Sequence, residues 1–126
     1  ARVAAYGTTE VERLLADAGI VRHRGKIAGA IASARAFQEI EVRQGFADFV
    51  WGFVEGVPVQ TGLQRMSDAV ASTPASTAMS KALRKAGFAF CGPSTVYAFM
   101  QAAGLVNDHL TDCHRHAAVS GVTARP

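Results

Sequence analysis

Near its N-terminus the chain carries two amphipathic helical patterns joined by a short turn. The apolar positions of these patterns are Val11, Leu14, Leu15 and Ala18 before the turn and Ile27, Ala30, Ile31, Ala34 and Phe37 after it. Thr9 and Glu12 predict a capping box at the start of the first helix. Gly19 stands where a left-handed residue would end that helix. The second helix is expected to begin near residues 24–26, so the predicted unit is helix, hairpin and helix.

The hairpin, residues 19–26, is rich in basic-type side chains. The first backbone N–H groups of the second helix lack partners inside that helix, so they favour an anion such as phosphate. Gly25 would let the backbone approach that anion closely. Two interpretations stay open: a solvated helix turn, or a sequence-independent grip on a nucleic-acid backbone. The predicted DNA-binding residues are Val21, Arg22, His23, Arg24, Gly25 and Lys26.

Gly45 is expected to end the second helix, and an apolar segment, residues 46–54, follows it. Periodicity alone does not separate a buried helix from a strand here, and the helical neighbours favour a helix. Its predicted buried stripe consists of Phe49, Val50, Phe53 and Val54. Trp51 would lie on a flank, where core packing is favoured over stacking on a base.

The rest of the chain is also divided by glycine and proline. The expected elements are a loop at 56–62, a turn at 67–70, a helix capped by Thr73 and ended by Gly87, a connector at 88–92 with buried aromatic side chains, and a helix from Pro93 to Gly104. About six helical segments and no strand ladder predict an all-α fold. Residues 1–126 are expected to form a single helical domain.

The overall charge is mildly basic, with a formal net charge of +3 over 126 residues. An anionic partner is therefore indicated by the local clustering at the hairpin more than by the total. No apolar run approaches the roughly 20 residues that cross a bilayer, and no charged leader precedes the first helix. We expect a cytoplasmic protein without a membrane segment. Residues 1–6 have helical composition but no cap before them, so the sequence is expected to begin inside or just after an element.

A histidine and a cysteine near the C-terminus have metal-ligand spacing. His109 and Cys113 are four positions apart, so on a helical turn they would share one face as zinc ligands. A structural zinc site needs four ligands, and the other candidates crowd the same segment: Asp108, Asp112, His114 and His116. A polar C-terminal tail is the alternative. Cys91 lies among apolar residues, where a buried thiol is expected, and a disulfide with Cys113 is not favoured.

Several motifs together resemble the DNA-3-methyladenine glycosylase I family, from about residue 10 to Cys113. They are ERLLADAGIVRHRGKI at 12–27, FADFVW at 46–51, STP at 72–74, SKAL at 80–83, GF at 87–88 and FMQAAGLVNDH at 99–109. The resemblance implies a helix-hairpin-helix DNA glycosylase fold. It also implies base excision repair by removal of 3-methyladenine from alkylated double-stranded DNA, by a monomer associated with the nucleoid.

The resemblance also implies roles for single residues. His109 and Cys113 match two of the four ligands of the family's structural zinc clip, and the other two lie in an N-terminal segment that has no match here. The family's base-pocket carboxylate and stacking tryptophan lie there too, so no catalytic residue is assigned. Tyr97 matches a position on the base-pocket side of the last helix, while Ala98 departs from the small polar residue common beside it.

The implied reaction needs little catalytic equipment, because 3-methyladenine is cationic in DNA and leaves readily once the base is extruded. This chain is expected to be an incomplete form that is inactive alone. A non-enzymatic helix-hairpin-helix module that only binds DNA is the alternative function. An all-α interaction domain without nucleic acid would leave the basic hairpin unexplained.

Overall fold

The computed structural model describes residues 1–121, which form six α-helices, short 3-10 turns and one pair of very short strands. The predicted all-α class is confirmed. Contacts divide the chain into two compact units, Ala1–Phe46 with Ala82–Cys91, and Ala47–Lys81 with the chain from Gly92 onward. The single domain expected over residues 1–126 stays a prediction. None of the described helices combines the length and apolar character that a membrane span requires.

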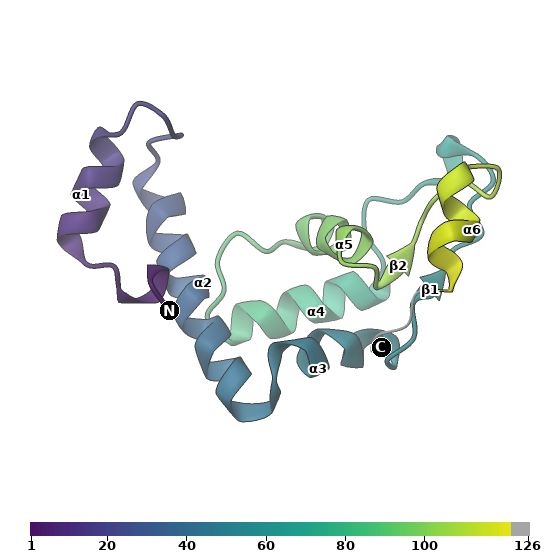
Figure 1. Ribbon diagram of the computed structural model, residues 1–126, viewed down its shortest axis with the longest axis horizontal. Helices are drawn as coiled ribbons and strands as arrows, with labels where there is room; N and C mark the ends of the chain where they lie inside the picture. Colours follow the sequence, from purple (N-terminus) through teal and green to yellow (C-terminus); the bar gives the residue numbers. More distant parts are fainter. Residues whose placement is uncertain (122–126) are drawn as a thin grey trace. The chain divides into compact units, whose positions relative to one another are not determined.

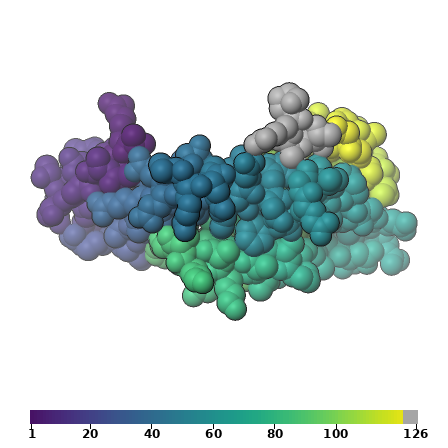
Figure 2. Space-filling model, turned by 90° about the horizontal axis from the view of Figure 1, so that it is seen from below, coloured from purple at the N-terminus to yellow at the C-terminus, as the bar shows by residue number. Residues whose placement is uncertain are grey.

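The first unit is built on the long helix α2 (Arg24–Gln44). The short turn η1 (Val3–Ala5) and helix α1 (Thr8–Ala16) lie against α2 (Figures 1 and 2). Arg35 holds η1 in place, since its Nε donates to the carbonyl of Ala4 at 2.9 Å and its guanidinium also reaches the carbonyl of Tyr6 at 3.2 Å. The predicted end of α2 is confirmed, because Gly45 follows it with a φ of 81°.

Helix α1 begins and ends earlier than the sequence pattern predicted. Glu10, and not Glu12, reaches back to the helix start, where its Oε2 accepts a hydrogen bond from the Gly7 N–H at 2.8 Å. This hydrogen bond lowers the pKa of the Glu10 carboxyl group. At the other end, the Asp17 carboxylate accepts from the Gly19 N–H at 2.8 Å. That turn replaces the predicted left-handed cap. Both predicted caps were therefore wrong, because neighbouring carboxylates compete for the backbone amides.

The connector before residue 92 packs closely on α2. The Ala89 N–H donates to Ser33 Oγ at 3.1 Å. A Cβ placed on Gly29 would lie 2.8 Å from two ring carbons of Phe90 and 3.0 Å from Ala89 Cβ. Glycine is therefore required at residue 29 by the approach of the connector, which the helical periodicity of α2 did not indicate.

The aromatic side chains of the connector are not all buried, in contrast to the expectation. Phe88 is half-buried and stacks on Phe46 with ring centroids 6.0 Å apart, and Phe46 also contacts Phe37 at 4.8 Å. Phe90 is 60% exposed and has a φ of 56°. The prediction was wrong for Phe90, whose ring meets the half of α2 near its start, at His23 and Gly29, and stays largely in solvent.

The second unit contains the remaining elements. These are α3 (Phe46–Trp51, whose first residue groups with the first unit), η2 (Gly52–Val54), β1 (Val59–Gln60), η3 (Met66–Asp68), most of α4 (Pro74–Lys85), α5 (Pro93–Ala102), β2 (Val106–Asn107) and α6 (His114–Ser120). Its core includes Val50, Val54, Met79, Val96, Tyr97, Met100, Leu105 and Val106. Apolar burial of this kind is the main stabilising term.

The helices predicted in this unit are confirmed. Residues 46–54 are helical, with Val50 and Val54 buried and Phe49, Trp51 and Phe53 half-buried. Thr73 caps α4, since its Oγ1 accepts from the Ser76 N–H at 3.1 Å while Ser76 Oγ accepts from the Thr73 N–H at 2.9 Å. Glycines with positive φ follow α4 and α5, at Gly87 and Gly104.

Three elements of this unit were missed: strands β1 and β2 and helix α6. Strands β1 and β2 pair in parallel, with Val59 opposite Val106 and Gln60 opposite Asn107. Each strand has only two residues, so no alternating pattern could reveal it. Helix α6 occupies part of the segment expected to be a polar tail, and it contacts β2 (Figure 1).

We expect Gly29→Ala to lower the free energy of unfolding by about 1 kcal/mol. Alanine would gain about 1 kcal/mol in helix propensity, but overpacking against Ala89 and Phe90 typically costs about 1–3 kcal/mol. Urea unfolding measures the difference. The control is Gly52→Ala, where a Cβ meets nothing within 4 Å and no loss is expected. Equal stability changes in the two variants would show that the connector can move away from α2 without cost.

Candidate functional site

The six predicted DNA-binding residues lie together in the first unit, in the turn before α2 and in its first helical turn. All six are exposed, and Val21 is 77% exposed. Helix α2 begins at Arg24, as predicted. The six residues therefore form one exposed surface, as the sequence predicted, but they differ in the contacts that they make.

His23 acts as the cap of α2. Its Nδ1 accepts a hydrogen bond from the Lys26 N–H at 3.0 Å, so this nitrogen must carry a lone pair. The sequence interpretation treated His23 only as a basic side chain, since histidine is not among the preferred capping residues. Within residues 1–121, the amides of Arg24 and Gly25 are the first-turn donors that remain without a described acceptor. Fewer backbone amides are therefore free to bind an anion at this helix start than the sequence predicted.

Arg24 is directed toward α1. Its guanidinium lies 2.9 Å from Glu12 Oε1, and both side chains are more than half exposed. An exposed ion pair of this kind contributes little to stability. It does divert Arg24 from a phosphate at the helix start, so Arg22 and Lys26 are the hairpin cations that have no ion pair among the described residues.

Asp108 forms the centre of a hydrogen-bond network in the second unit. Its Oδ2 accepts from the Tyr97 hydroxyl at 2.9 Å and from Gln101 Nε2 at 2.8 Å, and its Oδ1 accepts from Thr61 Oγ1 at 2.8 Å. These three donors are neutral, so they fix the carboxylate without neutralising its charge. The network joins α5, the segment after β1 and the segment after β2.

The carboxylate of Asp108 lines a pocket of about 410 Å³. The pocket is lined by Thr61, Gly62, Leu63, Gln64, Asp68, Val70, Thr73, Tyr97 and Asp108. Asp68 pairs with Arg65 at 3.2 Å, whereas the partners of Asp108 are the neutral groups named above. A small cationic ligand would therefore meet a fixed negative charge here.

Tyr97 is held in place by its hydrogen bond to Asp108, and little of it is exposed in the pocket. Its side chain is only 2% exposed. Burial raises the pKa of the Tyr97 hydroxyl to about 12, with further contributions from the hydrogen bond to Asp108 and its negative charge. The predicted base-pocket residue does lie at a pocket, but it offers little ring face for stacking. The sequence interpretation missed Asp108 as its partner, because their positions are brought together only by the fold.

His109 and Cys113 also lie together. His109 Nδ1 is 3.8 Å from Cys113 Sγ. Zinc with tetrahedral angles and ordinary bond lengths would separate such a nitrogen and sulfur by about 3.6 Å, so the pair fits two ligands of one ion. The expected helical turn was wrong, since residues 109–113 are irregular and Cys113 precedes α6. Within residues 1–121, no group of three or more potential ligands gathers around a metal-sized space.

Cys91 and Cys113 are not joined by a disulfide within the described chain. The Cys91 thiol lies 3.8 Å from the Phe88 carbonyl and is half-buried.

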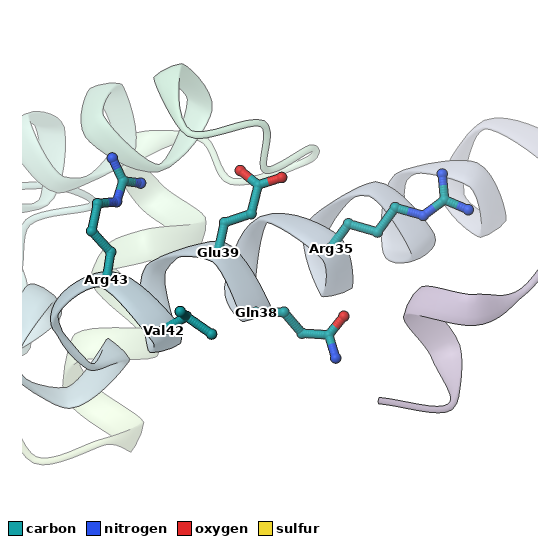
Figure 3. A pocket seen from close by; sticks show the side chains of 5 residues that line it. All are labelled: Arg35, Gln38, Glu39, Val42 and Arg43. Carbon is teal, nitrogen blue, oxygen red and sulfur yellow. The ribbon is translucent and has the colours of Figure 1, made fainter.

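Another hollow, of about 720 Å³, lies on α2 alone and is lined by Arg35, Gln38, Glu39, Val42 and Arg43. Figure 3 shows that Glu39 and Arg43 extend to one side of the helix and Gln38 to the other. The side chains do not converge on a common point, and no predicted site residue lines the hollow. The candidate binding sites are therefore the hairpin and the Asp108 pocket.

Comparison with known proteins gives a consistent result. A family model described as methyladenine glycosylase matches residues 1–116. Over 113 residues the chain is 51% identical to DNA-3-methyladenine glycosylase 1 of Escherichia coli (strain K12), an alignment that covers 89% of this chain and 60% of that protein. The chain thus spans about three fifths of the length of that relative.

Solved structures show the same similarity. A crystal structure of 3-methyladenine DNA glycosylase I matches with a TM-score of 0.86 and 52% identity, covering 90% of this chain and 63% of that one. The enzyme from Staphylococcus aureus, studied for its recognition of 3-methyladenine, matches with a TM-score of 0.85 and 35% identity, covering 89% of this chain and 60% of the other.

The raised pKa of Tyr97 predicts a loss of stability at alkaline pH. Because the folded-state pKa of about 12 exceeds the unfolded value of 10, the contribution is present below pH 10 and is lost as pH rises toward 12. It amounts to about 2–3 kcal/mol at most. Urea unfolding at several pH values measures it in a Tyr6→Phe background, where absorbance at alkaline pH reports Tyr97 alone. Ionisation of Tyr97 near pH 10 in the folded protein would contradict the network.

Proposed function

The chain belongs to the methyladenine glycosylase family, and we propose that it forms part of an enzyme that removes 3-methyladenine from alkylated double-stranded DNA. In this reaction water adds to the sugar carbon and gives up a proton to solvent as the N-glycosidic bond breaks, and the cationic base takes the bonding electrons and leaves as a neutral molecule. The methylated base is cationic in DNA, so it departs readily once it is extruded and held. Binding is then the main task of the protein.

The observation that carries this proposal is the charged pocket at Asp108. Its volume of about 410 Å³ lies in the range of small-molecule sites. The carboxylate is held by Tyr97, Gln101 and Thr61, so it is fixed before a ligand arrives. A fixed negative charge attracts a cationic purine more strongly than neutral adenine. Tyr97, which is nearly inaccessible, acts by orienting Asp108.

The basic hairpin has a separate role in the proposal. Arg22 and Lys26 bind phosphates on either side of the α2 start, as in a helix-hairpin-helix element, and Arg24 contributes less because of its ion pair with Glu12. Backbone contacts of this kind position the DNA without reading its sequence. The protein would act as a cytoplasmic monomer on the nucleoid.

A structural zinc ion is the proposed cofactor. The spacing of His109 Nδ1 and Cys113 Sγ supports a role as two of its four ligands. The other two would come from a segment outside this chain. The ion would tie that segment to the start of α6 and would take no part in the chemistry.

We expect the 126-residue chain to release no 3-methyladenine above background, and a form extended to the length of its relatives to release it. In the extended form, Asp108→Asn should slow release at least tenfold, because one of the fixed negative charges that attract the cationic base is lost. Chromatography of free base from methylated DNA measures the rate.

Asp68→Asn is the matched control, since Asp68 lines the same pocket but is paired with Arg65. It should change the rate by less than about threefold, given the small contribution of an exposed pair. Equal rates for Asp108→Asn and the parent would remove Asp108 from base recognition. A lack of release by the extended parent would favour the module that only binds DNA.

Zinc content provides an independent prediction. The extended protein should hold about one zinc ion per chain. Cys113→Ser should lower that value strongly, whereas Cys91→Ser should not, because Cys91 packs beside Phe88 in the first unit. Elemental analysis after dialysis measures both. One zinc ion per chain retained in Cys113→Ser would exclude this cysteine as a ligand.

A further inference from the structure

Phe90 adopts a backbone conformation and an exposure that are both unusual for its type. Its φ of 56° lies in the left-handed region, where a bulky residue is an outlier. Its side chain is also 60% exposed. Glycine would adopt this backbone with less strain. Packing within the first unit covers less than half of this side chain, so it explains a phenylalanine here only in part, and strained residues of this kind concentrate at functional sites.

The ring of Phe90 is held in a defined position despite its exposure. One side faces Gly29, where even a methyl group would come within 2.8 Å of the ring. The ring of His23 meets it edge-on, with centroids 6.5 Å apart and planes at 89°. The preceding residue, Ala89, is fixed by its hydrogen bond to Ser33. A rigid, exposed aromatic ring loses little entropy when it binds a partner.

The position of this ring next to the basic hairpin indicates the kind of partner. A Cβ on Gly25 would lie 3.9 Å from Phe90 Cζ, so the ring reaches the first turn of α2. Arg22 and Lys26 are exposed on the same short segment. Flat apolar surface beside cations is complementary to a nucleic acid, which combines flat bases with anionic phosphates.

We propose that Phe90 stacks on an unstacked base of DNA while Arg22 and Lys26 hold neighbouring phosphates. This inference rests on the proposed function, since extrusion of a damaged base leaves neighbouring bases unstacked. His23 links the two parts of the surface, because one ring caps α2 and supports Phe90. The contact is independent of the Asp108 pocket.

The test uses the 126-residue chain and a duplex with 2-aminopurine beside an abasic analogue. Phe90→Gly removes the ring and suits the left-handed backbone, so its melting temperature should equal or exceed that of the parent. Its affinity, from 2-aminopurine fluorescence, should fall about tenfold, as expected for loss of one stacked base. Phe90→Trp should stay within about threefold of the parent, because the aromatic face is kept.

Two controls separate stacking from charge and from general exposure. Arg22→Ala and Lys26→Ala should each reduce the slope of log affinity against log salt by roughly 0.9, whereas Phe90→Gly should leave the slope unchanged. Val42→Ala removes an apolar side chain that is 90% exposed on α2, and it should leave affinity unchanged.

Affinity of Phe90→Gly within twofold of the parent would overturn the proposal, as would an equal loss on an intact duplex. A change in sedimentation without a change in DNA affinity would show that Phe90 contacts a second copy of the chain instead. Base release by the extended form combined with Phe90-independent binding would refute this contact and leave the proposed function standing. Phe90-dependent binding without base release by the extended form would support this contact and refute the proposed function.

Discussion

The second unit depends on the hydrogen bonds made by two adjacent polar side chains, Asn107 and Asp108. Asn107 is 3% exposed, and its Nδ2, which has two hydrogens to donate, lies within hydrogen-bond distance of Gln60 Oε1, the His116 carbonyl and Ser120 Oγ. A buried amide left without these partners would be strongly destabilising. The bonds hold β1, β2 and α6 together and thereby place Asp108 beside Tyr97. His109 follows directly, so the candidate base pocket and the candidate metal ligands share one support.

In the first unit, a series of contacts around α2 likewise positions the candidate binding surface. Gly29 admits the connector, the connector carries Phe90, and Phe90 packs against the histidine that caps the helix. Exposed charges and an exposed ring are thus arranged by contacts that are themselves ordinary packing and capping. The turn and the connector that carry this surface are held against α2, and such support favours precise recognition.

Local patterns predicted much of this fold, and long-range contacts account for what they missed. Periodicity and glycine signals located α2, α4 and α5, because helices are specified by neighbours in sequence. The caps of α1 were wrong because Glu10 and Asp17 compete with equally plausible partners. Tyr97 came from family resemblance alone, and His109 and Cys113 came from their spacing as well as from the resemblance. The role of Asp108, in contrast, depends on Thr61, far away in sequence. No local pattern indicates that a Phe at residue 90 lies exposed in a left-handed conformation.

The pairing of β1 with β2 also bears on the order of folding. Gln60 and Asn107 lie 47 positions apart, and each strand contributes only two residues. Closing so long a loop for so few backbone bonds is entropically unfavourable until the intervening helices have formed. The Asp108 network should therefore assemble late, after α4 and α5. The pocket would be the last part of this unit to mature and the first to open in a partial unfolding event.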